Sequence, residues 1–137
     1  METFEEADFL CVRGRIRAFG HLTPAGITHT RTVKKHRQKP LWLVTDEISD
    51  TLGRPMQQHW HPAEGYEKLL RIEARDGQGQ PLEMVVEDGW YSGFYGKRMA
   101  AARLTCTTRG TLVTTEIELL DPNLPIPVYA DMPLDEA

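Results

Sequence analysis

Apolar and polar residues alternate along most of this chain with a period near two, the spacing at which successive side chains of a β-strand point to opposite faces. From residue 27 to 35, for example, threonines fall on one side and larger side chains on the other. Turn-forming residues separate such segments, as in the hairpin signal Asp76-Gly77-Gln78-Gly79. The expected strands are 9–19, 27–35, 41–48, 56–61, 69–75, 82–87, 98–108 and 111–120. This pattern predicts an all-β fold, an antiparallel β-sandwich.

Three segments depart from simple alternation. Residues 63–70 are the one helical candidate, which Gly65 weakens. Gly14 lies where the alternation of the first strand changes phase, so we expect a β-bulge there. The basic run at 31–37 is interpreted as a solvated strand edge, with attraction to an anionic polysaccharide as the alternative.

The chain length of 137 residues fits one domain with a genuine core. A hydrophobic fraction of 40% and a charged fraction of 26% are typical of a globular protein. Prolines accumulate after residue 121, which argues against regular structure there. We therefore expect a sandwich domain at 1–122 and a Pro-rich, extended or disordered tail at 123–137.

Charge and hydropathy exclude several classes of protein. The net charge of −4 argues against a general nucleic-acid binder, which needs a clustered excess of Lys and Arg. No apolar run approaches the roughly 20 residues of a membrane span, and the acidic start is unlike a signal peptide. We expect a protein without an export signal, periplasmic or cytoplasmic if it is part of a larger bacterial protein. Cys11 and Cys106 are expected to be buried thiols rather than a bridge between strands.

Histidines and an aspartate recur on three successive expected strands, at His29, Asp46, His59 and His61. Imidazole nitrogens and carboxylate oxygens are ordinary zinc ligands, and alternate residues of a strand share a face. Separations of 17 residues from His29 to Asp46 and of 13 from Asp46 to His59 suit adjacent antiparallel strands. A solvated or turn-capping role is the alternative for each, and parity does not choose between His59 and His61.

A segment rich in aromatic residues and glycine follows at 89–96. Such residues near a sheet edge are usually part of the core or a corner. The functional interpretation is a platform on which sugar rings stack, with a neighbouring cation pairing with a uronate carboxylate. The residues assigned to substrate binding are His61, Trp90, Tyr91, Tyr95, Lys97 and Arg98.

In succession these pieces resemble the heparinase II/III family of polysaccharide lyases, in the family's order, from about residue 10 to 122. The matching segments are 29–33 (HTRTV), 41–46 (LWLVTD), 59–62 (HWHP), 89–92 (GWYS), 95–96 (YG) and 119–122 (LLDP). The resemblance implies a sheet domain that packs against an α/α toroid and lines the cleft for an acidic, uronic-acid polysaccharide. It also implies a zinc ion held by His29, Asp46 and His59.

One departure from the family concerns catalysis. Relatives place a catalytic histidine two residues before the first zinc ligand, where this chain has Ile27, which can neither take nor give a proton. We therefore expect no catalytic residue in this chain, and a role as cleft wall and structural metal site within a lyase. The alternatives are a stand-alone carbohydrate-binding or interaction module and a small metalloenzyme on a β-scaffold.

Overall fold

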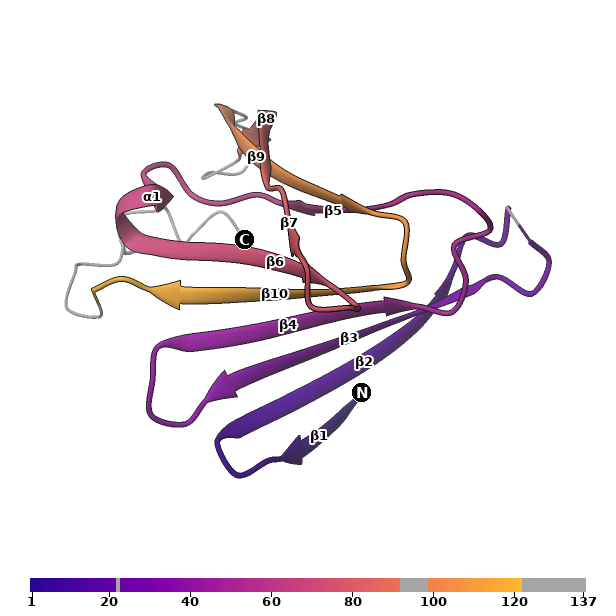
Figure 1. Cartoon of the computed structure of the whole chain (residues 1–137), viewed down its shortest axis with the longest axis horizontal. Coiled ribbons are helices and arrows are strands. Elements are labelled where there is room, and N and C mark those ends of the chain that lie inside the picture. The colour runs from indigo at the N-terminus through magenta and orange to yellow at the C-terminus, as the bar shows by residue number, and fades with distance from the viewer. Residues whose placement is uncertain (22, 92–98, 122–137) are drawn as a thin grey trace, which may run out of the picture.

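The computed structural model describes residues 1–21, 23–91 and 99–121, and in these ranges the protein is nearly all β. Two antiparallel sheets form a sandwich, which confirms the predicted fold class (Figure 1). The larger sheet has the order β1 (Glu2–Glu5), β2 (Phe9–Ala18), β3 (Ile27–His36), β4 (Leu41–Ile48), β10 (Leu112–Leu119), β6 (Leu70–Asp76) and β7 (Pro81–Leu82). The smaller has the order β5 (Met56–Trp60), β9 (Met99–Thr108) and β8 (Val85–Tyr91). A single short helix, α1 (Tyr66–Leu69), confirms the low helix content expected of the described residues.

Three details differ from the expectations drawn from the pattern. Strand β1 was not predicted, because its short acidic sequence shows little alternation; pairing with β2 holds it in place. The segment expected as one strand at 82–87 is divided between β7 in the large sheet and β8 in the small one. Strand β3 lies between β2 and β4, so the basic run is not a sheet edge.

The bulge expected at Gly14 is also absent. The pairing of β2 with β3 runs without interruption from Phe9 opposite His36 to Ala18 opposite Ile27. Side chains of β2 therefore keep one alternation throughout, and Cys11 shares a face with the arginines that follow it. That face is directed away from the small sheet.

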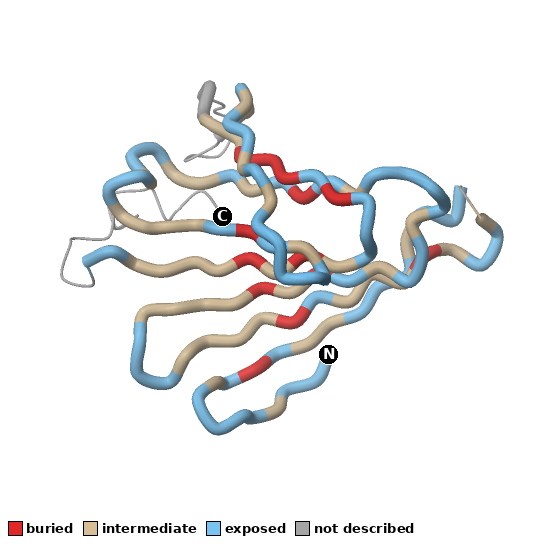
Figure 2. The backbone as a smooth tube through the Cα atoms, in the orientation of Figure 1, coloured by how far each residue is buried: buried red, intermediate tan, exposed pale blue. Residues whose placement is uncertain are grey.

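We call the opposite side of the large sheet its inner face. It carries Val113, Thr115 and Ala74, which are almost completely buried, and Val113 and Ala74 pack with Cys106 of β9. Buried residues gather where the two sheets face each other, whereas β1 and much of β2 are exposed (Figure 2). The core therefore lies under one half of a large sheet that is wider than its partner.

The two cysteines are free thiols, as expected. Cys11 and Cys106 are 2% and 1% exposed, and they lie in different sheets. Burial is the main cause that raises the pKa of both thiols. In the described ranges no helix is long and apolar enough to cross a membrane.

Candidate functional site

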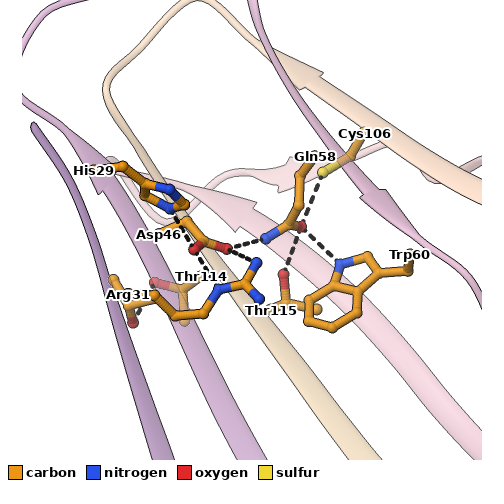
Figure 3. Close-up of polar contacts among 9 residues, drawn as sticks. His29, Arg31, Asp46, Gln58, Trp60, Cys106, Thr114 and Thr115 are labelled. Atoms are coloured by element: carbon orange, nitrogen blue, oxygen red, sulfur yellow. Dashed lines mark hydrogen bonds and ion pairs between the residues drawn. The ribbon is translucent and has the colours of Figure 1, made fainter. Parts of the chain in front are cut away.

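The carboxylate of Asp46 is the centre of the most extensive polar cluster on the inner face (Figure 3). Its Oδ1 accepts hydrogen bonds from His29 Nε2 at 2.9 Å and Arg31 Nε at 2.7 Å. Its Oδ2 accepts from Arg31 Nη2 at 3.1 Å and Gln58 Nε2 at 2.6 Å. Each carboxylate oxygen therefore accepts two hydrogen bonds from N–H donors. The Arg31 guanidinium binds the carboxylate through two parallel hydrogen bonds.

Strand register explains why these groups meet. Arg31 of β3 lies directly opposite Asp46 of β4, and His29 is two residues earlier on the same face. Gln58 comes from β5 of the small sheet and reaches across the sandwich. A buried carboxylate is costly unless it is paired and hydrogen-bonded, and here both conditions hold.

Gln58 connects the carboxylate to the rest of the core. While its Nε2 donates to Asp46, its Oε1 accepts from Thr115 Oγ1 at 2.8 Å and Trp60 Nε1 at 2.9 Å. The Cys106 thiol also points at Oε1, with a separation of 3.5 Å. One amide therefore links β4 and β10 of the large sheet with β5 and β9 of the small one.

Two opposing effects set the protonation of Asp46. Burial raises the pKa of its carboxyl, whereas the hydrogen bonds from Arg31, His29 and Gln58 lower it. The hydrogen bonds outweigh burial, and the pKa lies below the ordinary value of 3.8. Asp46 is therefore ionised at neutral pH, and the Arg31 guanidinium neutralises it.

Arg31 also reaches the surface of the cluster. Its side chain is 47% exposed, and its guanidinium carbon lies 5.6 Å from the centroid of the Trp60 ring. Among the described residues its Nη1 has no hydrogen-bond partner, since Nε and Nη2 make the bonds to Asp46. A second cation on an aromatic ring lies further along the same face, where Lys35 Nζ is 5.2 Å from the ring centroid of Trp42.

Of the three expected zinc ligands, the structure brings together His29 and Asp46 but not His59. His59 is exposed, and its Nδ1 forms a hydrogen bond with Thr105 Oγ1 at 2.9 Å. Since Gln58 points inward, the adjacent His59 points away from the cluster. His61 lies beyond the end of β5 and is exposed as well. Across the described part of the chain, no three His, Cys, Asp or Glu side chains are placed to hold a metal ion.

The donors around Asp46 do not fit a zinc ion. A metal would need a lone pair of the carboxylate, and each oxygen already accepts two N–H groups. One of these donors is the cationic Arg31, which repels a second positive charge at the same carboxylate. Zinc binding by His29, Asp46 and His59 stays a prediction, and the chemistry of the described site argues against it.

The remaining assigned residues are only partly described. Trp90 and Tyr91 belong to β8, with backbones opposite Ala100 and Met99 of β9. The other three, Tyr95, Lys97 and Arg98, and the tail at 123–137 lie outside the described residues. Ile27, which replaces the histidine implied by the family resemblance, is 4% exposed at the start of β3.

Sequence reasoning missed the roles of Arg31, Gln58 and Trp60. A signal was available in the alternation of β5, where Met56, Gln58 and Trp60 share one face. Because two of these three are large apolar residues, that face is the one to bury, and His59 falls on the other. Arg31 is two residues from His29 on β3, so both side chains lie on the same face as Asp46. This spacing was a sequence signal that Arg31 lies beside Asp46.

Comparison with known proteins finds similarity at the level of structure. No family model matches the chain, and no curated protein matches its sequence. The fold is similar to that of a heparinase III, with a TM-score of 0.62 and 16% sequence identity over 84% of this chain. It is also similar to a heparan sulfate lyase HepC mutant from Pedobacter heparinus, with a TM-score of 0.65 and 15% identity over 88% of this chain.

The chain spans about a fifth of the length of these solved lyases, 20% of the first and 21% of the second. At such low identity the similarity concerns the fold rather than the activity. The described strands therefore form a heparinase-like β-sandwich.

Proposed function

We propose that this chain is the sheet domain of a protein related to polysaccharide lyases and that it binds an acidic, uronic-acid polysaccharide on its inner face. The observation that carries the proposal is the exposed guanidinium of Arg31, fixed by Asp46 beside the ring of Trp60. A guanidinium held in this way keeps one edge free for a carboxylate or sulfate, and the neighbouring ring offers a surface for a pyranose.

A second cation and ring make the surface suitable for an extended ligand. Lys35 and Trp42 repeat the arrangement four residues along β3 from Arg31, a distance of roughly 13 Å at the rise of a strand. An oligosaccharide lying along β3 would meet both pairs. The structural neighbours support this ligand class, since one of them is named a heparan sulfate lyase.

The proposed role is binding and not proton transfer. A β-eliminative lyase must neutralise the uronate, remove a proton and protonate the leaving oxygen. Arg31 can serve the first requirement, but the buried Ile27 offers no acid or base for the others. The proton chemistry would come from an α/α toroid, as a further domain or as a separate subunit.

Binding can be tested by calorimetry with a heparan sulfate decasaccharide at two salt concentrations. Arg31→Ala and Trp60→Phe should each weaken binding about tenfold, because each removes one part of the cation and ring pair. The matched control is Arg17→Ala, which removes the same charge from an exposed arginine on the opposite face of the large sheet. Equal losses in Arg17→Ala and Arg31→Ala would reduce the interaction to general charge attraction and overturn the proposed site.

A stand-alone carbohydrate-binding module is the second candidate, and the absence of an acid or base at position 27 favours it as much as the first. The two differ in whether the chain works with a toroid. Co-expression with a toroid encoded beside it, followed by copurification, separates them. A stable complex supports the proposal that the chain is the sheet domain of a lyase-related protein. A chain that binds glycan but no toroid supports the stand-alone carbohydrate-binding module.

A further inference from the structure

A hollow of about 640 Å³ opens at the end of the sandwich where β3 begins and β4 ends, and we call it the end pocket. Ile27 and Ile48 of these two strands line it together with Met56 at the start of β5, so both sheets contribute to it. Ile27 is 4% exposed, and Met56 packs against the core. The volume lies within the range of sites that bind small molecules, and these three residues give the end pocket an apolar floor.

An aromatic pair from the connection between β2 and β3 forms one side of the rim. Phe19 and His21 line the end pocket, and their ring centroids are 6.2 Å apart. Phe19 has a φ of 59°, in the left-handed region that a bulky residue rarely adopts. Its ring is 46% exposed beside the apolar floor, where it adds to the surface that a ligand can contact.

The connection between β4 and β5 brings two opposite charges to the rim, Asp50 and Arg54. Asp50 Oδ1 accepts a hydrogen bond from Leu52 N at 2.9 Å, and Arg54 N donates to Thr51 O at 3.0 Å. The central residues Leu52 and Gly53 both have positive φ, as in a type I′ turn. This turn therefore fixes the backbone of Asp50 and Arg54 on either side of it.

The two rim charges do not neutralise each other directly. Among the described residues neither Asp50 nor Arg54 takes part in an ion pair, although both line the end pocket. His21 is the other ionisable side chain of the lining, and it packs beside Phe19. A ligand with a single charge would be attracted by one rim group and repelled by the other, whereas a ligand with both charges complements both.

We propose that the end pocket binds a small zwitterion with an apolar side chain, either an amino acid such as leucine or phenylalanine or a dipeptide of such residues. The ammonium group pairs with Asp50, and the carboxylate pairs with Arg54. The apolar side chain lies against Ile27, Ile48 and Met56. A dipeptide fills more of the hollow than a single amino acid and is therefore the better ligand.

A uronic-acid sugar is a poorer match for the end pocket. It has a carboxylate for Arg54 but no ammonium group for Asp50, and its hydroxyl groups would lose water against the apolar floor. The end pocket is also separate from the proposed polysaccharide surface. Ile27 lies four residues before Arg31 on β3, which is roughly 13 Å at the rise of a strand.

Methyl signals of the isotope-labelled full chain, titrated with leucyl-phenylalanine, test the proposal directly. The signals of Ile27, Ile48 and Met56 should shift with a dissociation constant in the millimolar range, because the two rim charges are exposed. Free phenylalanine should shift the same signals with lower affinity. Leu10 and Val12 of β2 should not respond. No change at Ile27 and Ile48 with either ligand would overturn the proposal.

Modified ligands test the three parts of the recognition separately. The N-acetyl form of the dipeptide lacks the ammonium group and the amide form lacks the carboxylate, so each should bind about fivefold more weakly, the upper end for an exposed ion pair. Glycylglycine has both charges but no apolar side chain and should cause no shift. Equal affinities for the dipeptide and its two modified forms would overturn the zwitterion as the ligand.

Two substitutions assign each charge to its partner. Arg54→Gln should weaken the dipeptide about fivefold and leave the affinity of its amide unchanged, since the lost partner is the carboxylate. Asp50→Asn keeps an oxygen for Leu52 N, and it should weaken the dipeptide but not its N-acetyl form. The matched control is Arg15→Gln, which changes an exposed arginine of β2 on the opposite face of the large sheet and should have no effect.

Other outcomes of these substitutions would contradict the assignment. If Arg54→Gln weakened the dipeptide and its amide equally, Arg54 would only shape the loop, and its pairing with the carboxylate would be wrong. A loss in Arg15→Gln as large as that in Arg54→Gln would reduce the effect to general charge. None of these measurements uses a polysaccharide, so their outcome does not depend on the proposed function.

Discussion

Gln58 of β5 donates a hydrogen bond of 2.6 Å to the buried carboxylate of Asp46 on β4. This contact joins the two sheets of the sandwich through a buried polar network that lies beside the apolar contacts of Val113, Ala74 and Cys106. Since no buried side-chain nitrogen or oxygen in the described residues lacks a partner, the polar network is complete there. A complete network fixes how the sheets are placed against each other, whereas apolar contacts alone allow sliding.

The first prediction concerns Gln58. Replacement by Leu keeps the approximate volume but deprives Asp46, Thr115 and Trp60 of their common partner. We expect a loss of about 3 kcal/mol in the free energy of unfolding, because buried polar groups are left unpaired. Urea denaturation followed by tryptophan fluorescence measures this loss.

Gln57 provides the matched control for that substitution. It is the adjacent residue on β5 and is exposed, so Gln57→Leu should change stability by less than about 0.5 kcal/mol. Similar effects of the two substitutions would show that the amide of Gln58 contributes nothing specific to the network.

The second prediction concerns acid stability. The pKa of Asp46 is lower in the folded chain than its ordinary value of 3.8, so the unfolded chain binds more protons at acidic pH. The stabilisation by Asp46 is therefore fully present above about pH 4 and is lost as the pH falls through the lower, folded value. Asp46→Asn should be less stable than the wild type at pH 7, with a smaller difference at pH 2.5.

Thermal unfolding across this pH range checks the prediction. Asp88→Asn is the control, because Asp88 is exposed on β8. A constant difference in melting temperature between wild type and Asp46→Asn at every pH would contradict a linkage through this carboxyl.

Much of the architecture follows from the alternation of apolar and polar residues, because each strand of a sandwich buries one face. The same alternation placed His29 of β3 and Asp46 of β4 on one face of the large sheet, where their side chains form a hydrogen bond. It was less informative for β1, whose stability depends on pairing with β2 and not on its own sequence. Local pattern cannot report such long-range pairing.

The polar cluster was harder to anticipate than the strands. The residue type suggested His59 as a ligand, although the partly buried Met56 and Trp60 share a face with Gln58, so that Gln58 points inward and His59 outward. The role of Arg31 depends on a contact between strands, and the same residue in a basic run looked like a solvated surface. In the sequence, histidine and aspartate residues suggested a metal site. In the structure, the pairing of the strands and the facing of the two sheets decide which of these side chains come into contact.

The third prediction concerns zinc. Because Arg31 already occupies the carboxylate of Asp46, added zinc or a chelator should leave the melting temperature within about 1 °C of the untreated protein. Differential scanning calorimetry and metal analysis of the purified protein provide the measurements. One bound zinc per chain, lost in both His29→Ala and His59→Ala, would instead establish the site that the family resemblance implies.

The last prediction concerns activity. The chain alone should not depolymerise heparan sulfate, heparosan or alginate, because Ile27 is buried and apolar where the family resemblance implies a catalytic histidine. β-Elimination leaves an unsaturated uronate, so the reaction is followed by ultraviolet absorbance, which should not rise above that of buffer. Ile27→His should not create activity, since one imidazole does not supply both the base and the acid that elimination requires. A rise in absorbance that depends on the wild-type chain and disappears in Arg31→Ala would show that the sheet domain has a catalytic centre of its own.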